Sequence, residues 1–123
     1  MNTITENLAK IQQEINKAKQ KSLYNQEVQI IAVTKSVSNE RTVEAFEADI
    51  IHLGENRPEG LMQKVEVLGQ KPIWHYIGTL QTRKVKQVLP FVDYIHSLDR
   101  LSLAEEINKR AENVIKCFVQ VNV

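Results

Sequence analysis

Short apolar runs alternate with stretches of helical periodicity along most of this chain, and this alternation constrains its fold more than any other feature. Runs rich in β-branched and aliphatic residues, each bounded by polar residues or glycine, are typical of buried parallel strands. Strands that alternate with helices indicate βα units and a parallel sheet. The strands are predicted at residues 29–34, 50–53, 73–77, 92–96 and 115–123.

An amphipathic helix is predicted ahead of the first strand. Thr3 and Glu6 have the spacing of a capping box at its start. Its apolar residues recur every three or four positions and so share one face. These residues are Ile4, Leu8, Ile11, Ile15 and Ala18.

Four more helices are predicted to connect the strands. In the one after the first strand, Val43 and Phe46 are expected to face the core. Asn56 and Asp99 are expected to cap the second and fourth of these helices, and Gly69 to end the second.

Two architectures are consistent with this order of helices and strands. An open doubly wound sheet fits the length of 123 residues, but such sheets usually end on a helix, whereas this chain ends on a predicted strand. A (β/α)₈ barrel needs about 250 residues. We therefore expect an α/β fold in which residues 1–123 form one incomplete barrel domain, a leading helix with about five of the βα strands.

Composition limits the environments in which the chain would work. The net charge is only +1, which does not suggest a nucleic-acid or membrane partner. Cys117 is the one cysteine and cannot form an internal disulfide, as is typical of a reducing compartment. A basic leader with an apolar segment and an apolar run of ~20 residues are both missing, so a cytoplasmic protein is predicted.

Lys35 is the first candidate for a residue that binds or reacts with a ligand. It follows the first predicted strand, and α/β proteins build ligand sites at the carboxyl ends of their strands. If the side chain were half-buried there, its pKa would fall and a nucleophilic amine would be available near neutral pH. Such an amine forms a Schiff base with an aldehyde such as pyridoxal phosphate. The alternative is a solvated or salt-bridged lysine at a strand end.

Other polar residues follow the predicted strands and would meet Lys35 at one rim. They are Glu55, Asn56, Gly78, Thr79, Ser97 and Asp99. Asn56 and Asp99 could equally be helix caps. The basic turn at residues 81–86 could bind an anion or be a solvated helix face.

All three histidines, His52, His75 and His96, lie on predicted strands and could together hold zinc. No HxH pair or HExxH motif supports that interpretation, which favours hydrogen-bonded histidines in the core. No metal site is therefore predicted.

Five sequence blocks, taken in order and spacing, resemble the pyridoxal phosphate homeostasis proteins of the proline-synthetase-co-transcribed type. The blocks cover residues 32–35, 54–57, 74–81, 97–100 and 118–122. The resemblance implies a barrel like the N-terminal domain of alanine racemase, with pyridoxal 5'-phosphate on Lys35 and with Asn56 and His75 near it. It also implies a carrier acting in vitamin B6 homeostasis without established catalysis. PLP-dependent apoenzymes would be the recipients.

The chain departs from this family in two ways. Arg57 is followed by Pro58, which changes the start of the next helix. The resemblance also implies that this is the N-terminal half of a longer protein, with the phosphate-binding segment beyond residue 123. The intact protein is expected to be a monomer. The fragment is expected to self-associate through unpaired strand edges and to bind the cofactor weakly.

Two other functions remain open from the sequence. One is a PLP-dependent enzyme of the racemase type, although Tyr24, Tyr76 and Tyr94 offer no obvious second acid or base. The other is a metal-dependent barrel hydrolase built on the three histidines.

Overall fold

The computed structural model describes residues 3–24 and 26–123. Its centre is a parallel sheet with the strand order β1-β2-β3-β4-β5. The strands are β1 (Ile31–Val33), β2 (His52–Glu55), β3 (Ile73–Tyr76), β4 (Tyr94–Leu98) and β5 (Lys116–Val119). The α-helices are α1 (Ile4–Lys21), α2 (Asn39–Glu47), α3 (Pro58–Leu68), α4 (Val85–Val88) and α5 (Leu101–Arg110). Short 3₁₀ turns, η1 (Thr82–Lys84) and η2 (Leu89–Phe91), flank α4.

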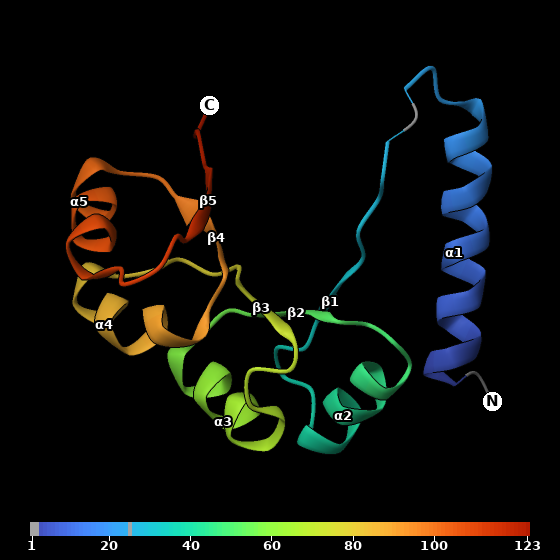
Figure 1. Ribbon diagram of the computed structural model, residues 1–123, viewed down its shortest axis with the longest axis horizontal. Coiled ribbons are helices and arrows are strands. Elements are labelled where there is room, and N and C mark those ends of the chain that lie inside the picture. The colour runs from blue at the N-terminus through green and yellow to red at the C-terminus, as the bar shows by residue number, and fades with distance from the viewer. Residues whose placement is uncertain (1–2, 25) are drawn as a thin grey trace.

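The order of the strands and the position of the helices decide between the two predicted architectures. Each strand pairs with the next one along the chain, and α2 to α5 lie on the same side of the sheet (Figure 1). A doubly wound sheet would reverse its strand order and carry helices on both faces. The fold is therefore the α/β fold of a (β/α)₈ barrel, of which the chain forms the leading helix and five strands.

The hydrophobic core lies between the sheet and these outer helices. Because side chains alternate along a strand, every second residue of β2, β3 and β4 points toward the helices. Leu53, Trp74 and Ile95 do so and are fully buried. The Trp74 indole N–H also donates to the carbonyl oxygen of Gly69 at 2.9 Å. That bond fixes the connection between α3 and β3.

The opposite, inner face of the sheet is largely polar and aromatic. It carries His52, His75, Tyr94, His96 and Phe118, which alternate with the core residues and contact one another. This inner face is open to solvent at its margins, where Val33 on β1 is 49% exposed and Phe118 on β5 is 55% exposed. It corresponds to the interior of a closed barrel.

Strands β2 and β4 lie two residues later in the chain than the sequence predicted, and the other three strands are shorter than predicted. Strand β2 was placed at residues 50–53, but Asp49 ends the α2 turn with φ +70° and the ladder begins only at His52. Strand β4 was placed at residues 92–96, but the Asp93 carboxylate accepts the Trp74 backbone N–H before that ladder begins. Strands β1, β3 and β5 are shorter than predicted, since apolar runs need not pair along their whole length.

The helices confirm part of the prediction and correct the rest. The Thr3–Glu6 capping box and the Gly69 stop, with φ +63°, are both present. In α2, however, Thr42 and Ala45 are buried, whereas Val43 and Phe46 are only half-buried. The amphipathic α1 has no buried residue and stands to one side of the sheet (Figure 1).

The two predicted helix caps were wrong. Arg57 and Arg100 occupy the N-cap positions of α3 and α5, and neither makes a side-chain capping bond. Asn56 and Asp99 each lie one residue earlier, which leaves their side chains free of the capping role.

No helix in the described part of the chain is long and apolar enough to cross a membrane.

Candidate functional site

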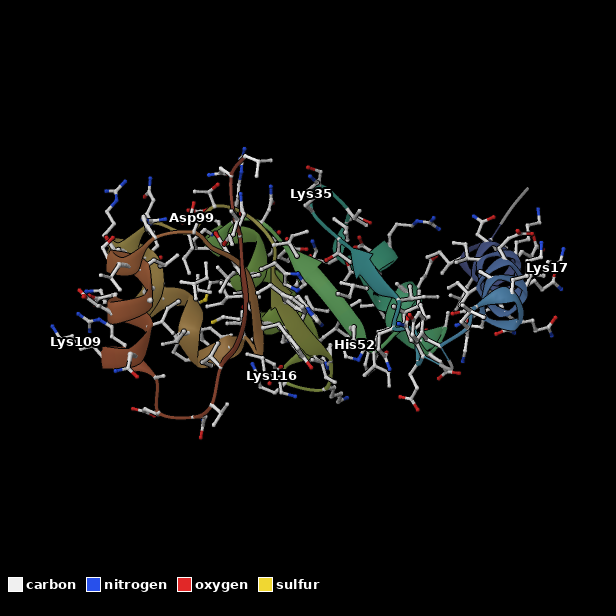
Figure 2. The ribbon with its side chains drawn as sticks, turned by 90° about the horizontal axis from the view of Figure 1, so that it is seen from above. Lys17, Lys35, His52, Asp99, Lys109 and Lys116 are labelled. Atoms are coloured by element: carbon white, nitrogen blue, oxygen red, sulfur yellow. The ribbon has the colours of Figure 1, made fainter. Side chains whose placement is uncertain are left out.

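Lys35 lies in the turn that follows β1, at the carboxyl-terminal edge of the sheet. Figure 2 shows it on the same edge as Asp99, with His52 and Lys116 toward the opposite edge. Its side chain is exposed, so the expectation of a half-buried lysine was wrong. Among residues 3–24 and 26–123, no ion pair engages its ammonium group. The amine is therefore open to a ligand at this edge.

The turn that carries Lys35 has a defined geometry. The Val37 N–H donates to the carbonyl oxygen of Thr34 at 3.2 Å and closes the turn. Ser36 adopts φ +60°, a left-handed conformation that non-glycine residues rarely take. The Thr34 N–H pairs with the Gly54 carbonyl oxygen at 2.9 Å. The base of the turn is thus joined to β2.

A buried polar cluster supports this turn from the helix side. The Lys64 ammonium donates to the Thr34 carbonyl oxygen at 3.1 Å and to Oε2 of Glu55 at 3.3 Å. The Thr34 hydroxyl donates to the same Glu55 oxygen. The side chains of Lys64 and Glu55 are only 3% and 2% exposed.

The sequence analysis missed this cluster, although one signal was available. Lys64 follows Leu61 by three residues and so lies on the apolar stripe of α3. A lysine at that position must either extend to solvent or find a buried partner. Glu55, one of the polar residues expected to meet Lys35 at the rim, instead contacts Lys64 of α3 and is buried.

Asn56, the second candidate residue, lies against Gly78, just after the ends of β2 and β3. A Cβ atom on Gly78 would lie 2.9 Å from both Cα and Cβ of Asn56. Only glycine fits at that position without displacing the backbone. Asn56, Tyr76, Gly78 and Lys84 line a hollow of about 370 Å³ at this edge. The structure therefore places Asn56 at the same rim as Lys35.

His75, the third candidate residue, lies deeper on the inner face and is 3% exposed. Its Nε2 is 2.9 Å from Nδ1 of His52, and its Nδ1 is 2.9 Å from Nε2 of His96. The Tyr94 ring stacks on it with centroids 4.4 Å apart. These contacts leave neither ring nitrogen of His75 free.

Burial lowers the pKa of two of these histidines. Desolvation, with His96 and His52 as like charges beside it, lowers the pKa of His75 to about 4. Burial also lowers the pKa of His96. The prediction of hydrogen-bonded histidines is confirmed. No group of three His, Cys, Asp or Glu side chains in residues 3–24 and 26–123 is placed to hold a metal ion.

Sequence comparisons identify relatives of this chain over nearly its whole length. It is 34% identical to the pyridoxal phosphate homeostasis protein of Pasteurella multocida, covering 98% of this chain and 55% of the relative. It is 36% identical to that of Aquifex aeolicus, covering 96% and 54%. The chain belongs to the pyridoxal phosphate homeostasis protein family. No protein-family model matches it.

Solved structures agree with this family assignment. PipY of Synechococcus elongatus with PLP bound superposes with a TM-score of 0.72 at 32% identity, covering 87% of this chain and 47% of PipY. The same protein without PLP gives a TM-score of 0.74 at 31% identity, with 87% and 46% covered. The chain spans about half the length of the curated relatives it matches.

The block at residues 74–81, which carries part of the family resemblance, contains residues that stabilise the fold near both of its ends. Trp74 and Leu80 are fully buried, and Gly78 allows the close approach to Asn56. Arg100 donates through Nη2 to the Leu80 carbonyl oxygen at 2.5 Å and through Nη1 to Asp99 at 2.7 Å. The bond to Leu80 joins the loops after β3 and β4, and the bond to Asp99 orients the Arg100 side chain. The rim that bears Lys35 and Asn56 is thereby fixed at several strand ends.

Proposed function

We propose that this chain binds pyridoxal 5'-phosphate and serves vitamin B6 homeostasis as a carrier rather than as an enzyme. Lys35 would hold the cofactor as a Schiff base, and Asn56 would contact it from the neighbouring strand end. PLP-dependent apoenzymes would receive it. The observation that carries the proposal is the position of Lys35, an exposed amine at the ligand edge of the sheet, free of any ion pair among the described residues.

The residues present fit a pyridoxal aldehyde at this edge. The aldehyde supplies an electrophilic carbon, and an unprotonated lysine amine condenses with it as water leaves. Lys35 Nζ would be the amine that reacts, since its side chain is exposed in the turn at this edge. Asn56 offers an amide that can donate or accept a hydrogen bond. His75 has both ring nitrogens engaged, so we place it in the layer beneath the ligand rather than in hydrogen-bond contact.

The phosphate group would be held elsewhere. Phosphate sites of (β/α)₈ barrels usually come from the loops after the seventh and eighth strands. The five strands of this chain do not include them. We therefore propose that residues 1–123 bind the aldehyde end of the cofactor and hold it less tightly than a closed barrel.

A carrier role is favoured over racemisation by the state of the tyrosines. A racemase of this fold type needs a second group that accepts or donates a proton opposite the lysine. Burial, with Glu59 nearby, raises the pKa of Tyr76 to about 12, so its hydroxyl stays protonated at neutral pH. Tyr94 is stacked on His75, and Tyr24 is 69% exposed between α1 and β1.

An absorbance titration tests the proposal. Added pyridoxal phosphate should produce the visible band of a lysine Schiff base in the wild-type chain, and Lys35→Met should lose it. Lys71→Met is the matched control, because Lys71 is exposed in the loop before β3, at the opposite edge. An equal loss of the band in both variants, or in neither, would refute the assignment. Racemisation of an amino acid by the loaded protein would refute the carrier role.

A further inference from the structure

The buried ion pair between Lys64 and Glu55 is hard to explain by stability alone. Two charges are withdrawn from water between β1, β2 and α3, with side chains 3% and 2% exposed. The desolvation cost of such a pair often exceeds its attraction, and well-packed apolar residues of the same volume serve stability as well or better. A specific contact would account for the charges at this position.

That contact is the main-chain oxygen of Thr34, the residue before Lys35. The oxygen has two lone pairs, and both are used. One accepts the Val37 N–H at 3.2 Å and closes the turn, and the other accepts from the Lys64 ammonium at 3.1 Å. The buried ammonium therefore binds the same carbonyl oxygen that closes the turn.

Glu55 fixes the ammonium and the strand end together. Its Oε2 accepts from both Lys64 and the Thr34 hydroxyl. Room for its other oxygen depends on Gly60, where a Cβ would lie 2.6 Å from Oε1. Ser36 adopts a left-handed conformation with φ +60°, which is costly for a non-glycine residue and persists where surrounding contacts hold it.

We propose that Lys64 and Glu55 are positioning residues for Lys35: the Lys64–Glu55 pair clamps the Thr34 carbonyl and so holds the turn in the conformation that presents the Lys35 amine to the aldehyde. The inference rests on the proposed function of Lys35. Neither residue touches the ligand.

The test separates positioning from stability with a charge-free pair. Lys64→Met alone leaves Glu55 buried without its partner and should destabilise the fold. Lys64→Met combined with Glu55→Leu removes both charges and should restore the unfolding midpoint. Ser97→Ala is the matched control. Its hydroxyl is also buried at the carboxyl end of a strand, and it has no hydrogen-bond partner among the described residues.

Two measurements are made on each variant of the full chain. Amide hydrogen exchange of residues 34–37 reports the turn directly, without ligand. Borohydride trapping with pyridoxal phosphate gives the ratio of adduct at Lys35 to adduct at Lys17, an exposed lysine on α1 with a side chain 70% accessible. In the double variant we expect exchange at 34–37 to rise about tenfold, as for the loss of a hydrogen bond to a charged group, and the adduct ratio to fall by a comparable factor.

The outcomes separate the two claims. Wild-type exchange and adduct ratio in the restored double variant would overturn the inference, because the pair would then serve stability alone. If wild-type Lys35 traps no more adduct than Lys17, the proposed function of Lys35 fails. The clamp on the turn is then judged by hydrogen exchange, and unchanged exchange would overturn it as well. Ser97→Ala should change neither measurement.

Discussion

Gly78→Ala should destabilise the fold by about 1.5–4.5 kcal/mol, because the ends of β2 and β3 leave no room for a methyl group. The added Cβ would collide with the backbone oxygen of Asn56 and would also lie 2.9 Å from Cα and Cβ of that residue. Carbon atoms in contact are normally about 3.5–4.0 Å apart, so the two strand ends would have to separate by roughly half an ångström or more. Overpacking of this kind costs about 1–3 kcal/mol.

The same movement stretches a hydrogen bond of the sheet. The Ile77 N–H donates to the Glu55 carbonyl oxygen at 2.9 Å, one residue before the collision on each strand. Losing that bond adds about 0.5–1.5 kcal/mol, which brings the total to the expected range. Urea unfolding followed by the fluorescence of Trp74, the chain's one tryptophan, measures the change.

Gly54→Ala is the control for this prediction. Gly54 lies on the adjacent strand, and its added Cβ would be 3.4 Å from Ile31 Cγ2 and 3.5 Å from Ile77, close to ordinary contact distances. Its free energy of unfolding should stay within about 1 kcal/mol of wild type. Equal unfolding free energies for the two variants would refute the argument from close approach.

Two further predictions concern the inner face. His75 has a pKa of about 4 in the fold against 6.5 when exposed, so the unfolded chain binds more protons between these values. The His75 contribution to stability should fall as the pH drops from 6.5 to 4, by at most about 1.4 kcal/mol per unit. His75→Gln should therefore reduce the slope in unfolding experiments across this range, and His96, whose pKa is also lowered, should account for part of what remains. Phe118, 55% exposed on β5, should promote self-association of the chain. Light scattering should show smaller particles for Phe118→Asp, and an unchanged size would rule Phe118 out as a contact.

Periodicity was sufficient to predict the parallel sheet and its connecting helices, whereas the preference for a barrel over a doubly wound sheet rested on the chain length and the terminal strand. Apolar runs of strand length alternate with helical stripes, and this alternation predicted the parallel sheet and its outer helices. The bounds of β2 and β4 were less accurate. Ile50 and Ile51 are as apolar as strand residues, yet the chain enters the ladder only after the left-handed Asp49. A local pattern does not report where two strands begin to pair.

The sequence predicted only part of the candidate site, because a local pattern does not report contacts between separate elements. Lys35 and Asn56 could be placed at the rim because they follow strands. The contact between Glu55 and Lys64 depends on which face of β2 meets α3. That is decided by the packing of the helix on the sheet, which brings together two residues nine positions apart in the sequence. The histidine row likewise depends on register, since His52, His75 and His96 meet only once three strands are aligned.

Peptide mapping of the reduced adduct tests the central claim most directly. The chain is incubated with pyridoxal phosphate, reduced with borohydride and digested, and the label on every lysine is quantified by mass spectrometry. We predict that Lys35 carries most of the label at low cofactor concentration, well above other exposed lysines such as Lys17 and Lys71. A label spread evenly over the exposed lysines, or concentrated on one other than Lys35, would contradict the account.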